Sequence, residues 1–252
     1  MTKIRKIKKR YLIPLIVIMI VISAAVIFFQ FTPLGYRMTV PYRNFTEIQK
    51  NVYVENNYSG DSGEIKSLVD EARNRVFEFW GNIESAPIVI VSDNAETLKK
   101  LGGDHDTATA IVFGAYSYIS VSNEYLNVDV LAHEMTHAEL HKRLYKGKLP
   151  QTLIPIWFDE GVATQNDYRE QYSDETWYER TNNGSDTIEL DDMDTATEFY
   201  AENADDRRFR YLISRHEVKE WIEKNGMDAL IRLIEKVNLG EDFYELYCNE
   251  IQ

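Results

Sequence analysis

The chain has 252 residues, with 28 lysines and arginines against 41 aspartates and glutamates, and a formal net charge of −13 at pH 7. Six of the cations lie in residues 1–10, so the remainder is strongly acidic, which argues against nucleic acid as a partner. Cys248 is the only cysteine, so the chain can form no intrachain disulfide. A domain of this length must therefore rely on its own apolar core.

The first 30 residues have the pattern of a signal anchor. A basic segment, residues 1–10, precedes an apolar run over residues 11–30, which as a helix would rise about 27 Å, close to the thickness of a bilayer's hydrocarbon core. Basic residues favour the cytoplasmic side, so we expect a single-pass membrane protein in which the residues after the apolar run are extracellular, and the composition suits a bacterial protein. The alternative is an export peptide cleaved near Ala25, which would leave an apolar N-terminus.

We expect residues 31–50 to form an irregular stalk, because prolines and a glycine interrupt them, and residues 51–252 to form one domain. Its first part shows an amphipathic helix over 64–80 and a short helix over 95–101. Strands are expected at 87–91, 108–113 and 114–121.

Residues 128–140 carry apolar side chains at helical spacing, and His133 and His137 lie four apart within them. Both imidazoles would therefore leave one face of the helix, a turn apart, and could bind one cation. Catalytic zinc takes three protein ligands and leaves its fourth position to water. Without a third ligand, the simpler reading is a helix with two satisfied histidines.

A second segment supplies the third ligand. Trp157-Phe158-Asp159-Glu160-Gly161 places Glu160 where it could complete a site for one Zn²⁺ per chain. Glu134, between the two histidines, would not bind the metal but would stand beside it, where a carboxylate can take a proton from water. These residues predict hydrolysis of peptide bonds.

The two segments together resemble the gluzincin metallopeptidases, the group that includes thermolysin and the zinc aminopeptidases. The resemblance implies that His133, His137 and Glu160 are the zinc ligands and Glu134 the general base. It also implies an α+β, zincin-like metallopeptidase domain with a small mixed sheet, the zinc-binding helix and a helical C-terminal half. In this clan an edge strand binds the substrate backbone, and residues 114–121 occupy the matching place.

The flanking residues carry further expectations. Gly161 would let the second helix approach the zinc helix closely. Histidine ligands usually donate their other ring nitrogen to a carboxylate, for which Asp159 and Asp167 are the candidates. A loop around Gly147 and Pro150 would absorb the long gap before Glu160.

Zinc aminopeptidases use a downstream tyrosine to assist the oxyanion. By resemblance Tyr200 is the first choice here, with Tyr211 and His216 as alternatives. His105 and His141 are expected to be solvated rather than extra ligands.

Beyond Glu160 we expect helices at 209–213, 218–224, 228–237 and 243–247, with breaks at Gly226 and Gly240. An acidic cluster precedes Tyr200 and could be a solvated loop, a rim of the cleft that favours cationic peptides, or a calcium site. It comprises Glu189, Asp191, Asp192 and Asp194.

The leading prediction is a membrane-anchored zinc metallopeptidase that cleaves a peptide or protein substrate outside the cytoplasm and contacts the lipid bilayer through residues 11–30. The alternatives are a catalytically silent binding or sensing protein on the same fold, and a structural surface domain without metal.

Overall fold

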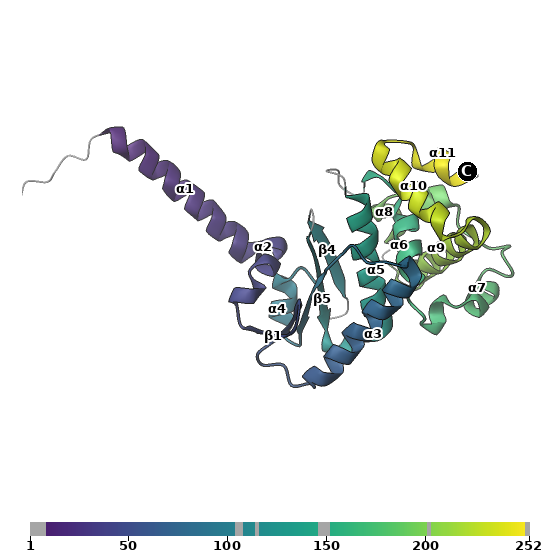
Figure 1. The fold of residues 1–252 in the computed structure, drawn as a ribbon, viewed down its shortest axis with the longest axis horizontal. Helices are drawn as coiled ribbons and strands as arrows, with labels where there is room; N and C mark the ends of the chain where they lie inside the picture. The colour runs from purple at the N-terminus through teal and green to yellow at the C-terminus, as the bar shows by residue number, and fades with distance from the viewer. Residues whose placement is uncertain (1–8, 104–107, 114–115, 146–151, 201–202, 250–252) are drawn as a thin grey trace, which may run out of the picture.

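The computed structural model describes residues 9–103, 108–113, 116–145, 152–200 and 203–249. These residues form an α+β fold in which a five-stranded mixed sheet lies against a helical half (Figure 1). The predicted fold class is confirmed at this level.

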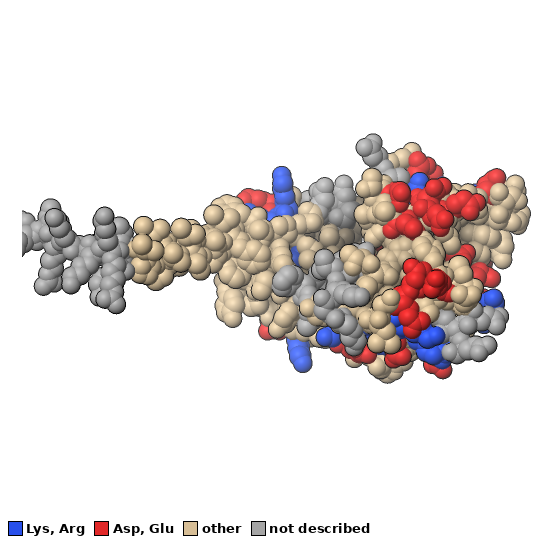
Figure 2. Space-filling view, turned by 90° about the horizontal axis from the view of Figure 1, so that it is seen from above, with Lys and Arg blue, Asp and Glu red and all other residues tan. Residues whose placement is uncertain are grey.

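The N-terminal apolar helix is present as α1 (Lys9–Phe31) and extends away from the folded domain (Figure 1). Its segment Ile13–Phe31 has a mean hydropathy of 2.7, is long enough to cross a membrane, and is not buried by the rest of the chain. Figure 2 shows it as a rod without charged side chains, whereas acidic side chains gather over the domain. A membrane anchor and a signal sequence share these properties.

The expected stalk over residues 31–50 is wrong, because most of this segment is folded. It forms α2 (Pro33–Met38), the 3₁₀ turn η1 (Val40–Tyr42) and β1 (Phe45–Gln49). Thr32 caps α2 by accepting a hydrogen bond from the amide of Gly35, and β1 pairs antiparallel with β2 (Val52–Glu55). The prolines and glycine that suggested an irregular lead-in instead start and shape a short helix.

The sheet continues with β3 (Ile88–Ser92), β5 (Tyr116–Ser122) and β4 (Thr109–Phe113). The strand order is β1-β2-β3-β5-β4. β2, β3 and β5 are parallel, whereas β4 pairs antiparallel with β5 and forms the edge opposite β1. The expectation that residues 114–121 form the edge strand is therefore wrong, since β5 is flanked on both sides. Two further helices, α3 (Ser62–Trp80) and α4 (Ala95–Lys100), confirm their predicted positions.

The helical half begins with the two helices that carry the sequence motifs, α5 (Val128–Leu144) and α6 (Ile156–Thr164). Two predicted segments merge into one helix, α9 (Ala204–Asn225), which α10 (Met227–Leu239) follows. Glycines with positive φ end both helices as expected (Gly226, 86°; Gly240, 97°). The other helices of this half are α7 (Asp174–Arg180), α8 (Ala196–Phe199) and α11 (Phe243–Cys248), with 3₁₀ turns η2 (Asn123–Tyr125), η4 (Glu170–Tyr172) and η5 (Leu190–Met193).

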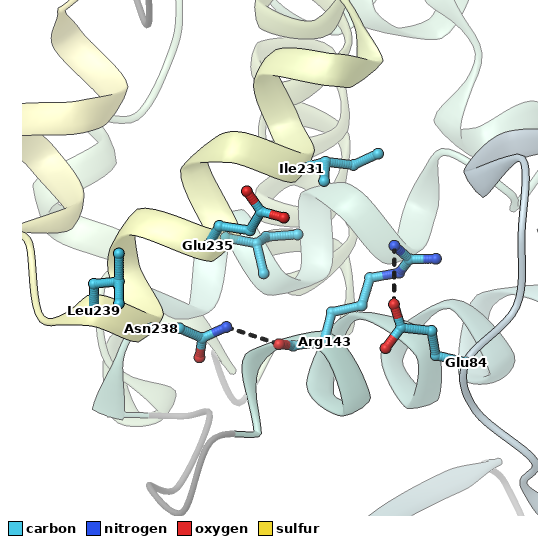
Figure 3. A pocket seen from close by; sticks show the side chains of 7 residues that line it. Glu84, Arg143, Ile231, Glu235, Asn238 and Leu239 are labelled. Carbon is cyan, nitrogen blue, oxygen red and sulfur yellow. Dashed lines mark hydrogen bonds and ion pairs between the residues drawn. The ribbon is translucent and has the colours of Figure 1, made fainter.

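A buried ion pair fixes the C-terminal part of α5. Glu139 accepts hydrogen bonds from the amides of Glu84 and Ser85 and from the guanidinium of Arg143, one turn further along the helix. Asn238 of α10 donates to the carbonyl of Arg143, and Arg143 also reaches Glu84 (Figure 3). These contacts hold α5 between the α3–β3 loop and α10.

Candidate metal centre

The motif residues His133, Glu134 and His137 lie in the second and third turns of α5. Asn127 caps the helix by accepting a hydrogen bond from the amide of Val130 at 2.9 Å. From Val130 to His141 every residue is buried except Glu134. A charged residue that alone remains accessible within a buried stretch of helix faces a cleft rather than the core.

The three expected ligands converge. The Nε2 atoms of His133 and His137 are 3.2 Å apart, and Glu160 Oε2 lies 3.3 Å from the first and 3.1 Å from the second. Ligand atoms about 2.0–2.1 Å from one tetrahedral zinc ion would be roughly 3.3–3.4 Å from one another. The two imidazoles and the carboxylate therefore fit one zinc ion without any change of side-chain position larger than a few tenths of an ångström.

Glu160 reaches the histidines because α9 packs tightly against α6 at Gly161, the residue after Glu160. A Cβ on Gly161 would lie 2.5 Å from the carbonyl oxygen of Ser214 and 2.6 Å from Val218, both in α9. The close approach predicted at Gly161 is real, but its partner is α9 and not the zinc helix. Gly161 lets α9 press α6 toward α5.

Asp159 joins two histidines. Its Oδ1 accepts a hydrogen bond from His137 Nδ1 at 2.7 Å, and its Oδ2 one from His141 Nε2 at 2.6 Å. The expected carboxylate partner of a histidine ligand is thus present. His141 was expected to be solvated at the helix end but is buried within this chain of hydrogen bonds.

His133 has a weaker partner. Its Nδ1 lies 4.0 Å from Asp167, whose carboxylate is engaged by the guanidinium of Arg169. Among the described residues this buried nitrogen has no hydrogen-bond partner. Of the two expected carboxylates, Asp159 is therefore the one that orients a ligand.

Burial and neighbouring groups act in opposite directions on the pKa values of His137, Asp159 and Glu160. Burial acts to lower the pKa of His137, but the charges of Glu160 and Asp159 outweigh it and raise that pKa well above 6.5. Burial acts to raise the pKa of Glu160, but the two histidines lower it to about 2, and histidines likewise hold the pKa of Asp159 far below its usual range. A zinc ion would replace the proton that His137 holds.

The cluster lines a cleft of about 650 Å³. Glu134 lines this cleft from α5, and Thr109, Ala110 and Ile111 line it from the edge strand β4. An exposed strand edge beside a row of polar side chains can hold an extended peptide.

Tyr200, the first choice for assisting the oxyanion, lies at the end of α8 and contacts the histidine–glutamate cluster. Its hydroxyl donates to Glu160 Oε1, the carboxyl oxygen that does not face the histidines. Burial and the charge of Glu160 raise the pKa of Tyr200, so the hydroxyl keeps its proton. Tyr211 lines the cleft with its ring centroid 6.0 Å from that of His133, whereas His216 stacks on Trp177 and does not line it.

The acidic cluster ahead of Tyr200 does not line the cleft in the described structure. Asp194 instead accepts a hydrogen bond from the hydroxyl of Tyr244, and its carbonyl accepts one from the amide of Ile156 at the start of α6. Asp194 therefore helps to position the start of α6. His105, Gly147 and Pro150 lie outside the described residues.

Neither a scan against protein-family models nor a search of curated protein sequences finds a match to this chain.

Proposed function

We propose that the protein is a zinc-dependent metallopeptidase with a zincin-like, gluzincin-type domain. The observation that supports this most is the triangle formed by the Nε2 atoms of His133 and His137 and Oε2 of Glu160, whose sides of 3.1 to 3.3 Å suit a tetrahedral zinc ion. Glu134 beside it, accessible from the cleft, distinguishes a hydrolytic site from a purely structural one.

The chain's own groups have separate tasks. Zinc, when bound, would polarise the scissile carbonyl and make a water molecule more acidic. The Glu134 carboxylate takes the proton of the attacking water and passes it to the leaving amine. The Tyr200 hydroxyl, protonated and next to Glu160, is placed to donate to the developing oxyanion. The β4 edge binds the substrate backbone, which aligns the scissile bond with these groups.

We further propose that α1 anchors the protein in a membrane, with residues 1–10 in the cytoplasm and the catalytic domain outside it. The support is the apolar segment Ile13–Phe31 and the basic residues that precede it. A protease added to intact cells should then reach the domain, and the mature protein should retain residues 1–25. A mature N-terminus after Ala25 would show a released enzyme instead.

Metal content tests the site directly. The full chain in detergent should carry one zinc per molecule and cleave members of a mixed peptide pool. His133→Ala, His137→Ala and Glu160→Ala should each lose the metal and the activity, whereas His216→Ala, a histidine outside the cleft, should keep both. Full zinc retention in the Glu160 variant would remove that residue from the ligand set, and metal without cleavage would favour the silent binding protein.

The pH dependence has a defined sign. Protonated His137 stabilises the metal-free domain below its unfolded pKa, and this contribution is lost as pH rises through its raised folded pKa. Zinc competes with that proton, so zinc affinity should rise with pH. Calorimetry in buffers of different ionisation enthalpy should show about one proton released per zinc at neutral pH. Zinc binding without proton release would contradict the raised pKa of His137.

A further inference from the structure

Arg37, in α2, ties the N-terminal segment to the sheet. Its side chain is wholly buried and donates to the carbonyls of Leu101, Thr109 and Tyr118 and to the Ser120 hydroxyl. A guanidinium with this many acceptors in the interior is held in one position, because losing any of them would leave a buried charge underpaired. α2 therefore moves with the sheet as one body.

The corner between α1 and α2 is equally tight. A Cβ on Gly35 would lie 2.2 Å from the carbonyl oxygen of Phe28, so the two helices touch through their backbones. Thr32 donates to the same carbonyl at 2.7 Å. Arg43 donates to the carbonyl of Phe29 at 2.6 Å and stacks 3.8 Å over the ring of Tyr36. We call residues 28–43 the corner; it clamps the end of α1 to the domain.

The corner also contacts the wall of the cleft. Arg37 donates to the carbonyl of Thr109, and Thr109 belongs to β4 and lines the cleft. The charge of Glu134 acts on Arg37, opposing the burial that lowers the Arg37 pKa to about 10. Figure 1 shows α2 beside the sheet, directly at the end of α1. One residue thus connects the base of the apolar helix to the substrate-binding edge.

Two strongly exposed aromatic side chains belong to the corner. Phe31, the last residue of α1, is 79% exposed, and Tyr42 is 89% exposed; the next residue, Arg43, donates to the Phe29 carbonyl in the last turn of α1. Aromatic side chains at this level suit the interface between a bilayer and water. They would seat the corner on the membrane surface.

We propose that the corner makes the cleft favour polypeptides anchored in the same membrane over free ones, and that these are cut at a fixed, short distance from the bilayer surface. This inference rests on the proposed peptidase function and on α1 spanning the membrane. A rigid link keeps the cleft at one height, so the effective concentration of an anchored substrate peaks at the spacer length that spans this height. A flexible stalk would let the cleft sample many heights, so the cleavage rate would depend less steeply on spacer length.

The test uses the full chain in phosphatidylcholine vesicles. A sequence that the enzyme cleaves as a free peptide is placed on acylated peptides behind flexible spacers of about 5, 15, 40 and 80 residues. The rate should be highest at one of the shorter spacers and fall about tenfold from about 15 to about 80 residues, since effective concentration declines as roughly the −3/2 power of spacer length. A flexible insertion of about 30 residues between Phe31 and Thr32 should reduce this fall to about fourfold.

Controls separate the outcomes. The same insertion between Asn183 and Gly184, in a surface turn, should leave the steep profile unchanged. Zinc content and cleavage of the free peptide should be equal in all three proteins. Equal rates at every spacer length, or a profile that the Phe31 insertion does not change, would overturn the inference while leaving the peptidase intact. An unmodified chain that contains no zinc and does not cleave the free peptide would overturn both this inference and the proposed peptidase function.

Discussion

The two faces of α5 both carry buried charge, but they use it differently. On one face Glu139 has its oxygens saturated by two backbone amides and Arg143. On the other, His133 and His137 converge on Glu160 with their Nε2 atoms 3.2 Å apart. The first arrangement is complete without a ligand, whereas the second is a triangle of metal-binding atoms that could hold a cation.

This contrast shows why burial of charge does not by itself identify a site. Glu139 is as deeply buried as any group in the candidate metal cluster, and its hydrogen-bond partners explain its position fully. A more specific indication of a binding site is a set of polar groups that converge on one point although they would repel one another, or remain unpaired, without a ligand. Substitutions on the two faces should therefore separate activity from stability.

The largest effect on activity, apart from loss of the metal itself, is expected on the cleft face. Glu134→Gln keeps the size of the side chain but cannot accept a proton, so turnover should fall by roughly 10² to 10⁴. Zinc content and the free energy of unfolding should stay unchanged, because Glu134 is not in the ligand triangle. Undiminished turnover would assign the base to another residue.

The opposite face should respond in stability. Glu139→Gln leaves the buried guanidinium of Arg143 without its carboxylate, which should lower the free energy of unfolding by about 3 kcal/mol. Glu84→Gln, which alters a half-exposed carboxylate 3.8 Å from the same guanidinium, should cost under about 1 kcal/mol. Denaturant unfolding measures both, and zinc per folded molecule should not change. A loss of zinc in Glu139→Gln at equal stability would erase the distinction between the faces.

Local spacing predicted the ligand triangle, because His133 and His137 lie one helical turn apart and Glu160 follows in a recognisable segment. Asp159 was also predictable, since it adjoins a ligand. The role of His141 was not, because it depends on where α6 places Asp159, and that is set by the packing of Gly161 against α9.

The N-terminal part of the fold was hidden for a similar reason. Arg37 lies in a segment rich in helix-breaking residues, and its acceptors are 64 to 83 positions further along the chain. The order of strands is likewise nonlocal, so the pattern of residues 108–121 predicted two strands without showing that β4, rather than β5, forms the edge. Both errors arise from long-range contacts that local patterns do not encode.

Tyr200 allows a finer test of the cleft face. If its hydroxyl stabilises the oxyanion, Tyr200→Phe should lower kcat by about 10² to 10³ and leave KM and zinc affinity nearly unchanged. If it only holds Glu160 through their hydrogen bond, zinc affinity should fall instead. Tyr211→Phe, which removes the other tyrosine hydroxyl of the cleft, is the matched control and should change kcat far less. The opposite ranking would move the oxyanion role to Tyr211.

The smallest effect is expected at Asp159. Both of its carboxylate oxygens already accept hydrogen bonds, as those of Glu139 do on the opposite face of α5. Asp159→Asn removes the charge that orients His137, so the zinc Kd should rise about 10- to 100-fold. His141→Leu removes only the donor to the second oxygen and should have an effect under about tenfold. His141→Gln places an amide donor near the position of Nε2 and should restore most of the affinity, which a purely steric role of His141 would not allow. Chelator competition measures all three, with His216→Leu as the control. Equal losses in the Leu and Gln variants would show that His141 acts by packing, and the hydrogen-bond chain through Asp159 would then end at His137.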